Sequence, residues 1–434
     1  MNQPQKGQIL SLEIRGLGSA GEGVGDANGY AVFVDGALPG ERIEATLLDA
    51  RKRHGFGKLL NILRPSPGRT EPACPLFGRC GGCQLMHLSY PLQLEAKRQR
   101  AVDALRRIGN LECPVEPCLP SPSPLSYRNK IQLPVQNGVF GLYARSSHDL
   151  VPVQSCAIHC SLGEEIFQKA KEILACYPNE GLRHLLIKSA IRTNEALAIL
   201  VTNASPTPAL IEASGLLLSS HPALKGVVHN QHSGAENVIL GSRYRVLAGE
   251  ETIREKLGDL VFQVSPASFF QVNPAQAERL YGKALEYAAL SGSETVVDAY
   301  CGVGTLALFF ARSARKVIGI ECVSQAIENA KKNASLNGIK NASFHCAKAE
   351  ECLPKIPRAD VILLNPPRKG CEKAVLDAIR SLFPAKVIYV SCDPATLARD
   401  LAALSAFGYK IETVQPFDMF PQTAHVECLA VLKK

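Results

Sequence analysis

The sequence predicts a multidomain α/β protein with an N-terminal OB-like β-barrel, a central α+β domain and a C-terminal doubly wound, Rossmann-like domain. Residues 1–66 contain short alternating strands separated by glycine-rich turns, which are typical of a small barrel. Residues 67–265 mix helix and strand patterns without βαβ regularity. From residue 266 to 434 strands alternate with helices, which indicates a parallel sheet. The length of 434 residues agrees with about three domains.

Composition excludes several classes of protein. Lys and Arg number 48 against 40 Asp and Glu, and the net charge of +8 permits a polyanionic partner without requiring one. The N-terminus lacks a signal-peptide pattern, and every apolar run is shorter than the ~18 residues that suggest a membrane span. We therefore expect a soluble cytoplasmic protein without membrane association. In such a protein the 15 cysteines are not expected to form a disulfide framework.

The barrel is predicted from strands at 9–14, 30–34 and 42–47, with a glycine-dense stretch at 16–25. A basic run at 51–58 follows the third strand. Its cations are natural contacts for phosphate groups, and the alternative is an ordinary solvated surface.

A helix is predicted at 90–108 from apolar residues spaced near 3.6. We assign it to the central domain, with packing on the C-terminal domain as the alternative. Its other side is basic and is expected to contact phosphate groups or to be a solvated face. The basic residues are Lys97, Arg98, Arg100, Arg106 and Arg107.

A cofactor site is predicted where an apolar strand at 295–299 runs into Gly302-Val303-Gly304 and a helix. The next strand ends at Glu321, an acid that can accept both hydroxyl groups of a ribose. The third glycine of the dinucleotide fingerprint is missing. This favours a cofactor without a pyrophosphate, such as S-adenosylmethionine, over the alternative of a chance turn.

Three further features lie at the ends of strands. Asn365 begins an Asn-Pro-Pro-Arg segment after the strand at 361–364, where it forms either a rigid loop or a wall beside a methyl donor. Cys392 follows the strand at 387–391, and from its position alone a nucleophile and a structural cysteine are equally supported. Glu427 lies in an otherwise apolar strand, where an acid is costly unless it is paired or functional.

A cysteine cluster precedes the predicted helix. Cys74, Cys80 and Cys83 fall within ten residues, and Cys156 or Cys160 supplies a fourth thiol. Four thiolates bind either zinc or an iron–sulfur cluster. The paired Cys-x2-Cys knuckles that are common in zinc sites occur here once, which favours the cluster.

The segments 365–370, 389–396 and 417–427 together resemble the RNA uracil-5-methyltransferase family. The segments 269–274 and 300–304 are similar to its cofactor-binding segments, and the N-terminal unit resembles a TRAM domain, an RNA-binding OB-type barrel. The resemblance covers nearly the whole chain. It departs from the family at Asp393, where Asn is usual, and at Asn365, where Asp is commoner.

The resemblance implies a class I methyltransferase that uses S-adenosylmethionine to methylate carbon 5 of a uridine in RNA. It implies Cys392 as the nucleophile that adds to carbon 6 of uracil and Glu427 as the base that removes the carbon 5 proton. The residues implied for cofactor binding are Gln271, Tyr300, Glu321 and Asn365. The residues implied for a [4Fe–4S] cluster are Cys74, Cys80, Cys83 and Cys156, in preference to Cys160.

A TRAM unit together with the cysteine cluster is similar to the bacterial branch that modifies 23S ribosomal RNA, so we expect that substrate and a monomeric enzyme. One alternative is a uridine in transfer RNA. Another is methylation of an amino group of adenine or cytosine, because Asn-Pro-Pro also lines such sites. Those sites usually place an aromatic residue where Arg368 stands. A non-catalytic RNA-binding paralogue is the third alternative, and intact Cys392 and Glu427 argue against it.

Overall fold

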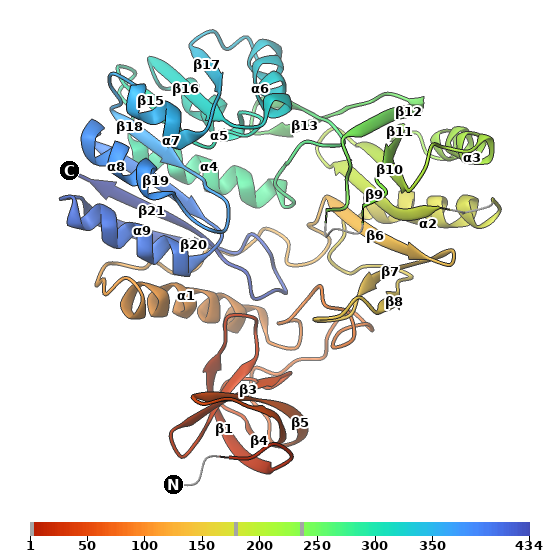
Figure 1. The fold of residues 1–434 in the computed structure, drawn as a ribbon, viewed down its shortest axis with the longest axis vertical. Coiled ribbons are helices and arrows are strands. Elements are labelled where there is room, and N and C mark those ends of the chain that lie inside the picture. The colour runs from red at the N-terminus through yellow and green to blue at the C-terminus, as the bar shows by residue number, and fades with distance from the viewer. Residues whose placement is uncertain (1–3, 178–180, 235–237) are drawn as a thin grey trace.

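The computed structural model describes residues 4–177, 181–234 and 238–434, and it contains a barrel, a central domain and a C-terminal domain (Figure 1). Five strands close the barrel in the order β1-β2-β3-β5-β4, which confirms the predicted N-terminal barrel. Alternate residues such as Leu12, Val32 and Ile43 fill its interior. The strands are β1 (Ile9–Leu17), β2 (Gly23–Ala27), β3 (Tyr30–Asp35), β4 (Arg42–Ala50) and β5 (His54–Arg64).

Two barrel strands lie outside the segments predicted as strands. β2 runs through the glycine-dense stretch, and its inward positions include Gly23 and Gly25. β5 contains the end of the basic run, and its first inward positions are Gly55 and Gly57. Because glycine replaces the apolar residue at these positions, the alternation on which strand prediction relies is missing from both segments.

The central domain is a seven-stranded sheet in the order β12-β11-β10-β9-β6-β7-β8, in which β10 and β11 are parallel and the other pairs are antiparallel. Helices α2 (Ser161–Ala175) and α3 (Pro208–Ser219) cover one face. The hairpin of β13 (Ile253–Leu257) and β14 (Leu260–Val264) packs on the other face and leads into the C-terminal domain. The sheet strands are β6 (Lys130–Gln136), β7 (Val139–Tyr143), β8 (Leu150–Pro152), β9 (Leu182–Ala190), β10 (Glu195–Thr202), β11 (Leu224–Gln231) and β12 (Arg243–Gly249).

The C-terminal domain holds a second seven-stranded sheet, in the order β17-β16-β15-β18-β19-β21-β20. Strands β15 to β19 are parallel, whereas β21 is antiparallel to both of its neighbours. Helices lie on both faces, which confirms the doubly wound, Rossmann-like prediction. The strands are β15 (Thr295–Asp298), β16 (Lys316–Glu321), β17 (Ala342–Cys346), β18 (Val361–Leu364), β19 (Lys386–Ser391), β20 (Lys410–Phe417) and β21 (Glu427–Lys433).

The helices of this domain are divided between two apolar cores, one on each face of the sheet. One core joins α4, α5 and α6 to the face of the sheet that also meets the central domain, and the other joins α7, α8 and α9 to the opposite face. The helices are α4 (Pro274–Ala288), α5 (Thr305–Ala311), α6 (Ser324–Leu336), α7 (Ala349–Cys352), the 3-10 helix η1 (Leu353–Lys355), α8 (Lys373–Leu382) and α9 (Pro394–Ala406).

Helix α1 (Tyr90–Arg107) is distant in sequence from the C-terminal domain but packs on α9 and on strand β20. Its Ala101 and Leu105 are buried in the same core as α8 and α9. In Figure 1 the helix runs alongside α9, between the C-terminal sheet and the barrel. The structure thus places α1 against the C-terminal domain.

The expectation that the basic side of α1 contacts RNA is wrong for Lys97, whose side chain is 1% exposed and pairs with Asp418. Arg98 donates to the carbonyl oxygen of Val115, and Arg100 donates to that of Ala424. Lys97 lies four residues before Ala101 and therefore on the buried side of the helix, where the loop that carries Asp418 and Phe420 covers it. Within the part of the chain that the structure describes, no helix is long and apolar enough to cross a membrane.

Candidate active site

The carboxyl ends of four parallel strands meet at one edge of the C-terminal sheet. β15 ends at Asp298, β16 at Glu321, β18 just before Asn365, and β19 just before Cys392. β15 pairs with β16 on one side and with β18 on the other, so the strand order reverses there. Ligands of doubly wound sheets bind outside the carboxyl ends of the strands at such a reversal. The sequence-predicted side chains on these strands therefore gather at the expected edge.

Strand pairing brings Cys392 and Glu427 together. β21 is antiparallel to β19, and Ser391 pairs with Cys428 in that ladder. The next residue outward on each strand is therefore Cys392 on one and Glu427 on the other. Cys392 is half-buried, whereas Glu427 is 3% exposed.

Burial and nearby charges shift the protonation of both groups. Burial raises the pKa of Glu427 to about 8, and the nearby Arg368 guanidinium opposes the rise. Burial also raises the pKa of the Cys392 thiol, the charge of Glu427 adds to the rise, and Arg368 again opposes it. A carboxyl group whose pKa lies near neutrality is well suited to proton transfer. Arg368 supports ionisation of both groups.

His425 lies in the same loop as Glu427 but is a weaker candidate for the base. Burial lowers the pKa of His425 to about 4, and the charges of Arg368, Arg100, Lys97 and Arg128 lower it further. The imidazole is therefore neutral at pH 7 and a poor proton acceptor. The three arginines make the surroundings of the loop positive, whereas the charge of Lys97 is paired with Asp418.

Asp393, where the sequence departs from the family, has a structural partner. It is the N-cap of α9, and its Oδ1 accepts hydrogen bonds from the backbone N–H groups of Ala395 (2.8 Å) and Thr396 (3.2 Å). An N-cap carboxylate satisfies two of the N–H groups that the first helical turn leaves unpaired. The cap fixes where the strand ends and the helix begins, and so fixes the position of Cys392.

Glu321 is oriented by the loop that follows β15. Its carboxylate accepts hydrogen bonds from the backbone N–H of Gly302 (3.2 Å) and from that of Val323 (2.9 Å). A carboxylate has about four acceptor sites, so capacity remains for a ligand. Glu321 therefore lies at the cofactor loop, as the sequence predicted.

Asp298 is a functional candidate that the sequence reasoning missed. Its Oδ1 accepts from the backbone N–H of Tyr300, but among the described residues its buried Oδ2 has no hydrogen-bond partner. Burial raises the pKa of Asp298 to about 7; the Tyr300 N–H opposes this rise and the charge of Glu321 increases it. A buried oxygen without a partner and a second acid beside it fit a cationic ligand such as S-adenosylmethionine. The signal in the sequence was an acid at the end of an otherwise apolar strand.

Tyr281 of α4 is a second candidate that the sequence reasoning missed. It lies between the predicted cofactor loop, Gln271 and Glu427. Burial raises the pKa of its hydroxyl to about 12, and the charge of Glu427 adds to the rise. Hydrogen bonds to Thr305 and Gln271 act in the opposite direction. The Tyr281 and Thr305 oxygens are 3.5 Å apart. One buried side chain thus lies near the cofactor loop, near Gln271 and near Glu427. In sequence it is an ordinary apolar position of a helix.

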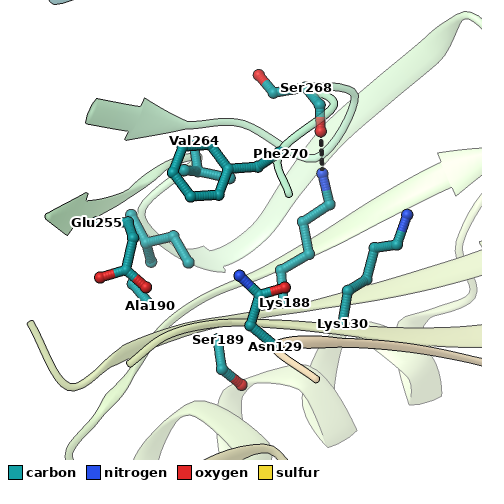
Figure 2. Close-up of a pocket in the computed structure, with 10 residues that line it drawn as sticks. Asn129, Lys130, Lys188, Ser189, Ala190, Glu255, Val264, Ser268 and Phe270 are labelled. Atoms are coloured by element: carbon teal, nitrogen blue, oxygen red, sulfur yellow. Dashed lines mark hydrogen bonds between the residues drawn. The ribbon is translucent and has the colours of Figure 1, made fainter. Parts of the chain in front are cut away.

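A small pocket of about 20 Å³ lies between the central sheet and the segment that carries Gln271 (Figure 2). Lys188 of β9 donates from Nζ to the carbonyl oxygens of Ser265 and Ser268, both at 2.8 Å. Asn129 donates from Nδ2 to the carbonyl oxygen of Gln271 at 3.2 Å. Burial lowers the pKa of Lys188 to about 7, and the nearby charge of Lys130 contributes. The central domain therefore holds this segment in place.

Tyr300 lies at the edge of a buried polar network. Burial raises the pKa of Tyr300, and its contact with Cys371 contributes. Cys371 contacts the Tyr389 hydroxyl, which donates to Asp400 Oδ2 at 2.6 Å. Asp400 also accepts from the backbone N–H of Cys371 at 2.8 Å. The network links Cys371, which follows the Asn365 segment, and Tyr300 to Asp400 of α9.

Comparison with known proteins identifies the family. Residues 230–434 match the family model for tRNA (uracil-5-)-methyltransferases, and residues 3–60 match the TRAM domain. An uncharacterized RNA methyltransferase of Clostridium tetani is 42% identical over 99% of this chain and 97% of its own. One of Halalkalibacterium halodurans is likewise 42% identical, with the same coverage of both chains.

The chain belongs to the RNA uracil-5-methyltransferase family. It is therefore an RNA methyltransferase with an N-terminal TRAM domain. Among solved structures, the tRNA (uracil-54, C5)-methyltransferase of Pyrococcus abyssi in complex with S-adenosyl-L-homocysteine matches with a TM-score of 0.78 at 27% identity. The match covers 98% of this chain and all of that one.

In this RNA uracil-5-methyltransferase the cysteine cluster lines a cavity of about 380 Å³. Arg368, Phe420 and His425 line the same cavity. Cys160 does not line this cavity, and it is buried elsewhere, at 4% exposure. The cysteines that line the cavity are Cys74, Cys80, Cys83 and Cys156.

Burial raises the pKa of Cys83 to about 12, and the neighbouring thiols Cys156, Cys80 and Cys74 raise it further. In the described ranges, no three His, Cys, Asp or Glu side chains converge tightly enough to hold a single metal ion. In a [4Fe–4S] cluster each cysteine binds a different iron, so the four sulfurs stand farther apart than around one ion. The four thiols fit that donor set, while the iron–sulfur site stays a prediction.

The loop at 418–425, which leads into Glu427, is held by α1 and by the cysteine segment. Lys97 pairs with Asp418 and donates to the carbonyl oxygen of Phe420, and Gln93 and Gln422 exchange hydrogen bonds at 3.0 and 3.1 Å. The backbone N–H groups of Gln84 and Leu85 donate to the carbonyl oxygen of Gln422. The loop is thus fixed by residues more than 300 positions away in sequence.

The TRAM barrel contacts the same loop. A Cβ added at Gly21, whose φ is +88°, would come within 2.8 Å of Gln84 Cβ and 3.3 Å of Ala424 Cβ. Glycine is required by this close approach and by the left-handed backbone. The turn between β1 and β2 therefore lies directly against the active-site loop.

Proposed function

We propose that this chain transfers a methyl group from S-adenosylmethionine to carbon 5 of a uridine in RNA through a covalent bond to Cys392. The observation that carries the proposal is the juxtaposition of Cys392 with buried Glu427 at the edge where Asp298 and Glu321 converge. Membership of the family supports the reaction, and the paired thiol and carboxyl group supply the two protein functions that it needs.

In the proposed reaction the thiolate of Cys392 adds to carbon 6 of the uracil. The electron pair of the carbon 5–carbon 6 double bond moves toward the carbonyl group at carbon 4, so that carbon 5 becomes nucleophilic. When bound, S-adenosylmethionine would supply an electrophilic methyl group to carbon 5, and its sulfur would depart as the neutral thioether of S-adenosylhomocysteine. Glu427 then takes the proton from carbon 5, the double bond re-forms, and the sulfur of Cys392 leaves as thiolate.

The cofactor is proposed to be held by Gln271, Tyr300, Glu321 and Asn365, with Asp298 added from its unpartnered oxygen. The target uridine is proposed to leave its stack, because a base within a helix cannot reach Cys392. Arg368, Arg100 and Arg128 place positive charge around the entrance, which supports a backbone rich in phosphate groups.

The direct test uses Cys392→Ala and Glu427→Gln. Cys392→Ala should bind S-adenosylmethionine, show no turnover and trap no RNA containing 5-fluorouridine. Glu427→Gln with RNA and radiolabelled S-adenosylmethionine should accumulate a methylated protein–RNA band on a denaturing gel, because carbon 5 keeps its proton. Loss of a general base costs about 10²–10⁴ in rate. Cys113→Ala is the control, and wild-type turnover by Cys392→Ala would refute the mechanism.

We propose further that Cys74, Cys80, Cys83 and Cys156 hold a [4Fe–4S] cluster, supported by the shared cavity and the thiol donor set. When bound, it would link the segment at 74–83 to the segment at Cys156 and so brace the wall of the active site. Anaerobically purified protein should be brown and contain about four irons per chain. Serine at any of the four positions should bleach it, whereas Cys160→Ser should not. Stoichiometric zinc without iron would overturn this proposal.

For the substrate we propose a uridine of 23S ribosomal RNA, supported by the combination of a TRAM barrel with the cysteine cluster. A uridine in transfer RNA is the second candidate, favoured by the likeness to the Pyrococcus abyssi enzyme. Mapping 5-methyluridine in both RNA classes from a strain lacking the gene separates them. Loss of 5-methyluridine from ribosomal RNA supports the ribosomal substrate. Loss of 5-methyluridine from transfer RNA supports the transfer-RNA substrate.

A further inference from the structure

Two exposed cysteines meet at the edge of the sheet that carries the predicted cofactor site. Cys322 directly follows β16, and Cys346 is the last residue of β17, the edge strand of the C-terminal sheet (Figure 1). Among the described residues the third exposed cysteine is Cys176, which follows α2 in the central domain. Cys322 and Cys346 are therefore the exposed thiols beside the cofactor loop.

The pairing of β16 with β17 sets the distance between the two cysteines. Cys346 is the register partner of Glu321, so Cys322 lies one residue further along the neighbouring strand. Parallel strands lie about 4.8 Å apart and rise about 3.3 Å per residue, which separates the two Cα atoms by about 6 Å. Disulfide-bonded cysteines have Cα atoms roughly 4.4–6.8 Å apart. The backbone therefore holds the pair within the range in which a disulfide forms.

The two side chains already interact in the reduced protein. The Cys346 thiol donates weakly to the carbonyl oxygen of Cys322, with 3.8 Å between sulfur and oxygen. Because the Cα separation suits a disulfide, bond formation needs a change of side-chain rotamer and no change of strand pairing.

Cys322 is also part of the environment of Glu321. Its thiol donates to Glu321 Oε1 at 3.3 Å, and the backbone N–H of Val323 donates to the same oxygen at 2.9 Å. The other oxygen, Oε2, accepts from the backbone N–H of Gly302 at 3.2 Å. These donors orient the carboxylate that we assign to the ribose. A sulfur in a disulfide has no proton to donate, so oxidation of Cys322 removes one of these hydrogen bonds.

We propose that Cys322 and Cys346 form a reversible disulfide that weakens cofactor binding, so that peroxides regulate the methyltransferase. The inference rests on the proposed function, because Glu321 must hold the ribose for the disulfide to affect binding. In the reduced protein Glu321 keeps its thiol donor. In the oxidised protein Cys322 is drawn toward the edge strand, and the carboxylate is less firmly oriented toward the ribose hydroxyl groups.

The reaction needs a two-electron oxidant of the peroxide class. The Cys346 thiolate attacks one peroxide oxygen and the O–O bond breaks, which leaves a sulfenic acid and a hydroxide that takes up the proton lost by the thiol. The sulfur of Cys322 then attacks the sulfenic sulfur. The S–S bond forms, the S–O bond breaks, and the departing hydroxide takes the Cys322 proton. Each cysteine sulfur gives up one electron, and hydrogen peroxide becomes two molecules of water.

The surroundings of the two thiols set the order of these steps. The hydrogen bond to Glu321 raises the pKa of the Cys322 thiol, and burial, the charge of Glu321 and the charge of Cys346 add to the rise. The thiolate is the nucleophile toward peroxide, so Cys322 is disfavoured in the first step. Cys346 therefore meets the peroxide, and Cys322 resolves the sulfenic acid.

Cofactor binding and disulfide formation oppose each other by the same factor. If the disulfide weakens binding of the cofactor, the bound cofactor shifts the thiol–disulfide equilibrium toward the thiols to the same extent. In a redox buffer of glutathione and glutathione disulfide, saturating S-adenosylhomocysteine should therefore raise the share of protein in which the pair is reduced.

The test uses the full chain and graded amounts of hydrogen peroxide. Free thiols are then blocked with N-ethylmaleimide, and peptide mass spectrometry locates linked cysteines. Calorimetry measures the affinity for S-adenosylhomocysteine before and after dithiothreitol. Cys346→Ser is the deciding variant, because Cys346 is exposed at a sheet edge and its loss keeps the Cys322 donor. Cys176→Ser, at the other exposed thiol, is the matched control.

We expect peroxide to link Cys322 to Cys346 in the wild type and in Cys176→Ser. Their affinity for S-adenosylhomocysteine should fall about 3- to 10-fold, as for the loss of one hydrogen bond, and should recover with dithiothreitol. Cys346→Ser should form no such link and keep its affinity with or without peroxide. Because Cys392 and the cysteine cluster meet the same peroxide in every variant, this comparison isolates the exposed pair.

Absence of the linked peptide from peroxide-treated wild type would overturn this inference and leave the proposed function intact. A linked protein that binds S-adenosylhomocysteine as tightly as the reduced one would overturn it too, and so would an equal loss of affinity in Cys346→Ser. Failure of the reduced wild type to bind S-adenosylhomocysteine would instead contradict the proposed function. If Cys346→Ser has a lowered melting temperature, Cys322→Ala decides, and a loss of its affinity on peroxide treatment counts against the pair.

Discussion

At Glu427 the burial of a carboxyl group that the proposed reaction needs lowers the stability of the fold. Its carboxyl group is buried at the start of a strand whose other residues are almost all apolar, and burial raises its pKa to about 8. In water an acid has a pKa near 4.3. The folded protein therefore holds the proton of Glu427 over a pH range in which the unfolded chain has released it.

This difference between the folded and unfolded pKa predicts that Glu427 makes the folded protein less stable as the pH rises. Because the folded pKa is raised, the contribution of Glu427 to stability is full below about pH 4.3 and is lost as the pH rises through about 8. Glu427→Gln removes the ionisation. The melting temperature of Glu427→Gln relative to the wild type should therefore be higher at pH 9 than at pH 5, as measured by calorimetry. Glu71→Gln, at an exposed position, is the control, and a difference that shrinks with pH would contradict the prediction.

Residues with an unusual type for their pattern could be predicted from the sequence. Cys392 at a strand end and Glu427 in an apolar strand stood out, and the structure places them side by side. Asp298 and Tyr281 did not stand out, because an acid closing a strand and an aromatic residue in an apolar helix face are both common. Their relevance depends on what lies opposite them, which pairing of distant strands and helices decides.

At the scale of elements, α1 acts as a support for the active-site loop. Its buried side carries Gln93 and Lys97 in line with Ala101 and Leu105, so the face makes polar contacts in its first half and apolar contacts in its second. A buried ion pair adds little to stability when complete, but loss of one partner leaves a charge unpaired in the interior. The Lys97–Asp418 pair thus fixes the position of the loop more than it stabilises the fold.

Lys97→Met should destabilise the protein by about 3–5 kcal/mol, because Asp418 stays buried without its cation. The loop leading to Glu427 should be displaced, so kcat should fall while affinity for S-adenosylmethionine is kept. Urea unfolding and steady-state kinetics measure the two effects. Arg107→Met on the same helix, where the arginine side chain is 79% exposed, should change neither. If both variants behave alike, the ion pair has no role in positioning the loop.

Strands and helices with regular apolar spacing were predictable, and those without it were not. β18 and β19 are continuous apolar runs, as expected for strands buried on both faces of a parallel sheet. β2 and β5 of the barrel use glycine at inward positions and gave no such signal. The basic residues of α1 were read as a surface because local periodicity carries no information on a loop that arrives from the other end of the chain.

At the scale of the whole molecule, one arginine docks the barrel on the central domain. Arg145, in the connection between β7 and β8, pairs with Asp35 at 2.9 Å and with Glu22 at 3.3 Å, and donates to the carbonyl oxygen of Ala20 at 3.0 Å. Glu22 and Ala20 belong to the turn that touches the active-site loop. The orientation of the barrel therefore depends on contacts with both other domains.

Arg145→Ala should loosen the barrel without affecting the chemistry. We expect KM for substrate RNA to rise several-fold with kcat unchanged, because exposed ion pairs contribute about 0.2–1 kcal/mol each and the arginine makes two. Steady-state kinetics at varied concentrations of substrate RNA measure this KM. Arg64→Ala, which removes an exposed arginine 3.9 Å from Glu13 on the barrel itself, should leave KM as it is. A drop in kcat alone would show that docking serves catalysis and not RNA binding.

The order of the three domains followed from composition and periodicity, but their contacts did not. The central sheet buries one face against the hairpin at 253–264, and the segment at 115–119 pairs with β20. These contacts join residues whose local patterns are unremarkable, so no window of sequence could reveal them.

The contact at Gly21 predicts that the length of RNA between the barrel and the active site affects which RNAs are methylated. With the turn wedged between Gln84 and Ala424, the barrel cannot move toward or away from Cys392 without breaking the packing of the active-site loop. The number of nucleotides that span the gap between a barrel-bound segment and the reacting uridine is then a fixed quantity. RNAs with the right local sequence but one nucleotide more or fewer in that span would be poor substrates.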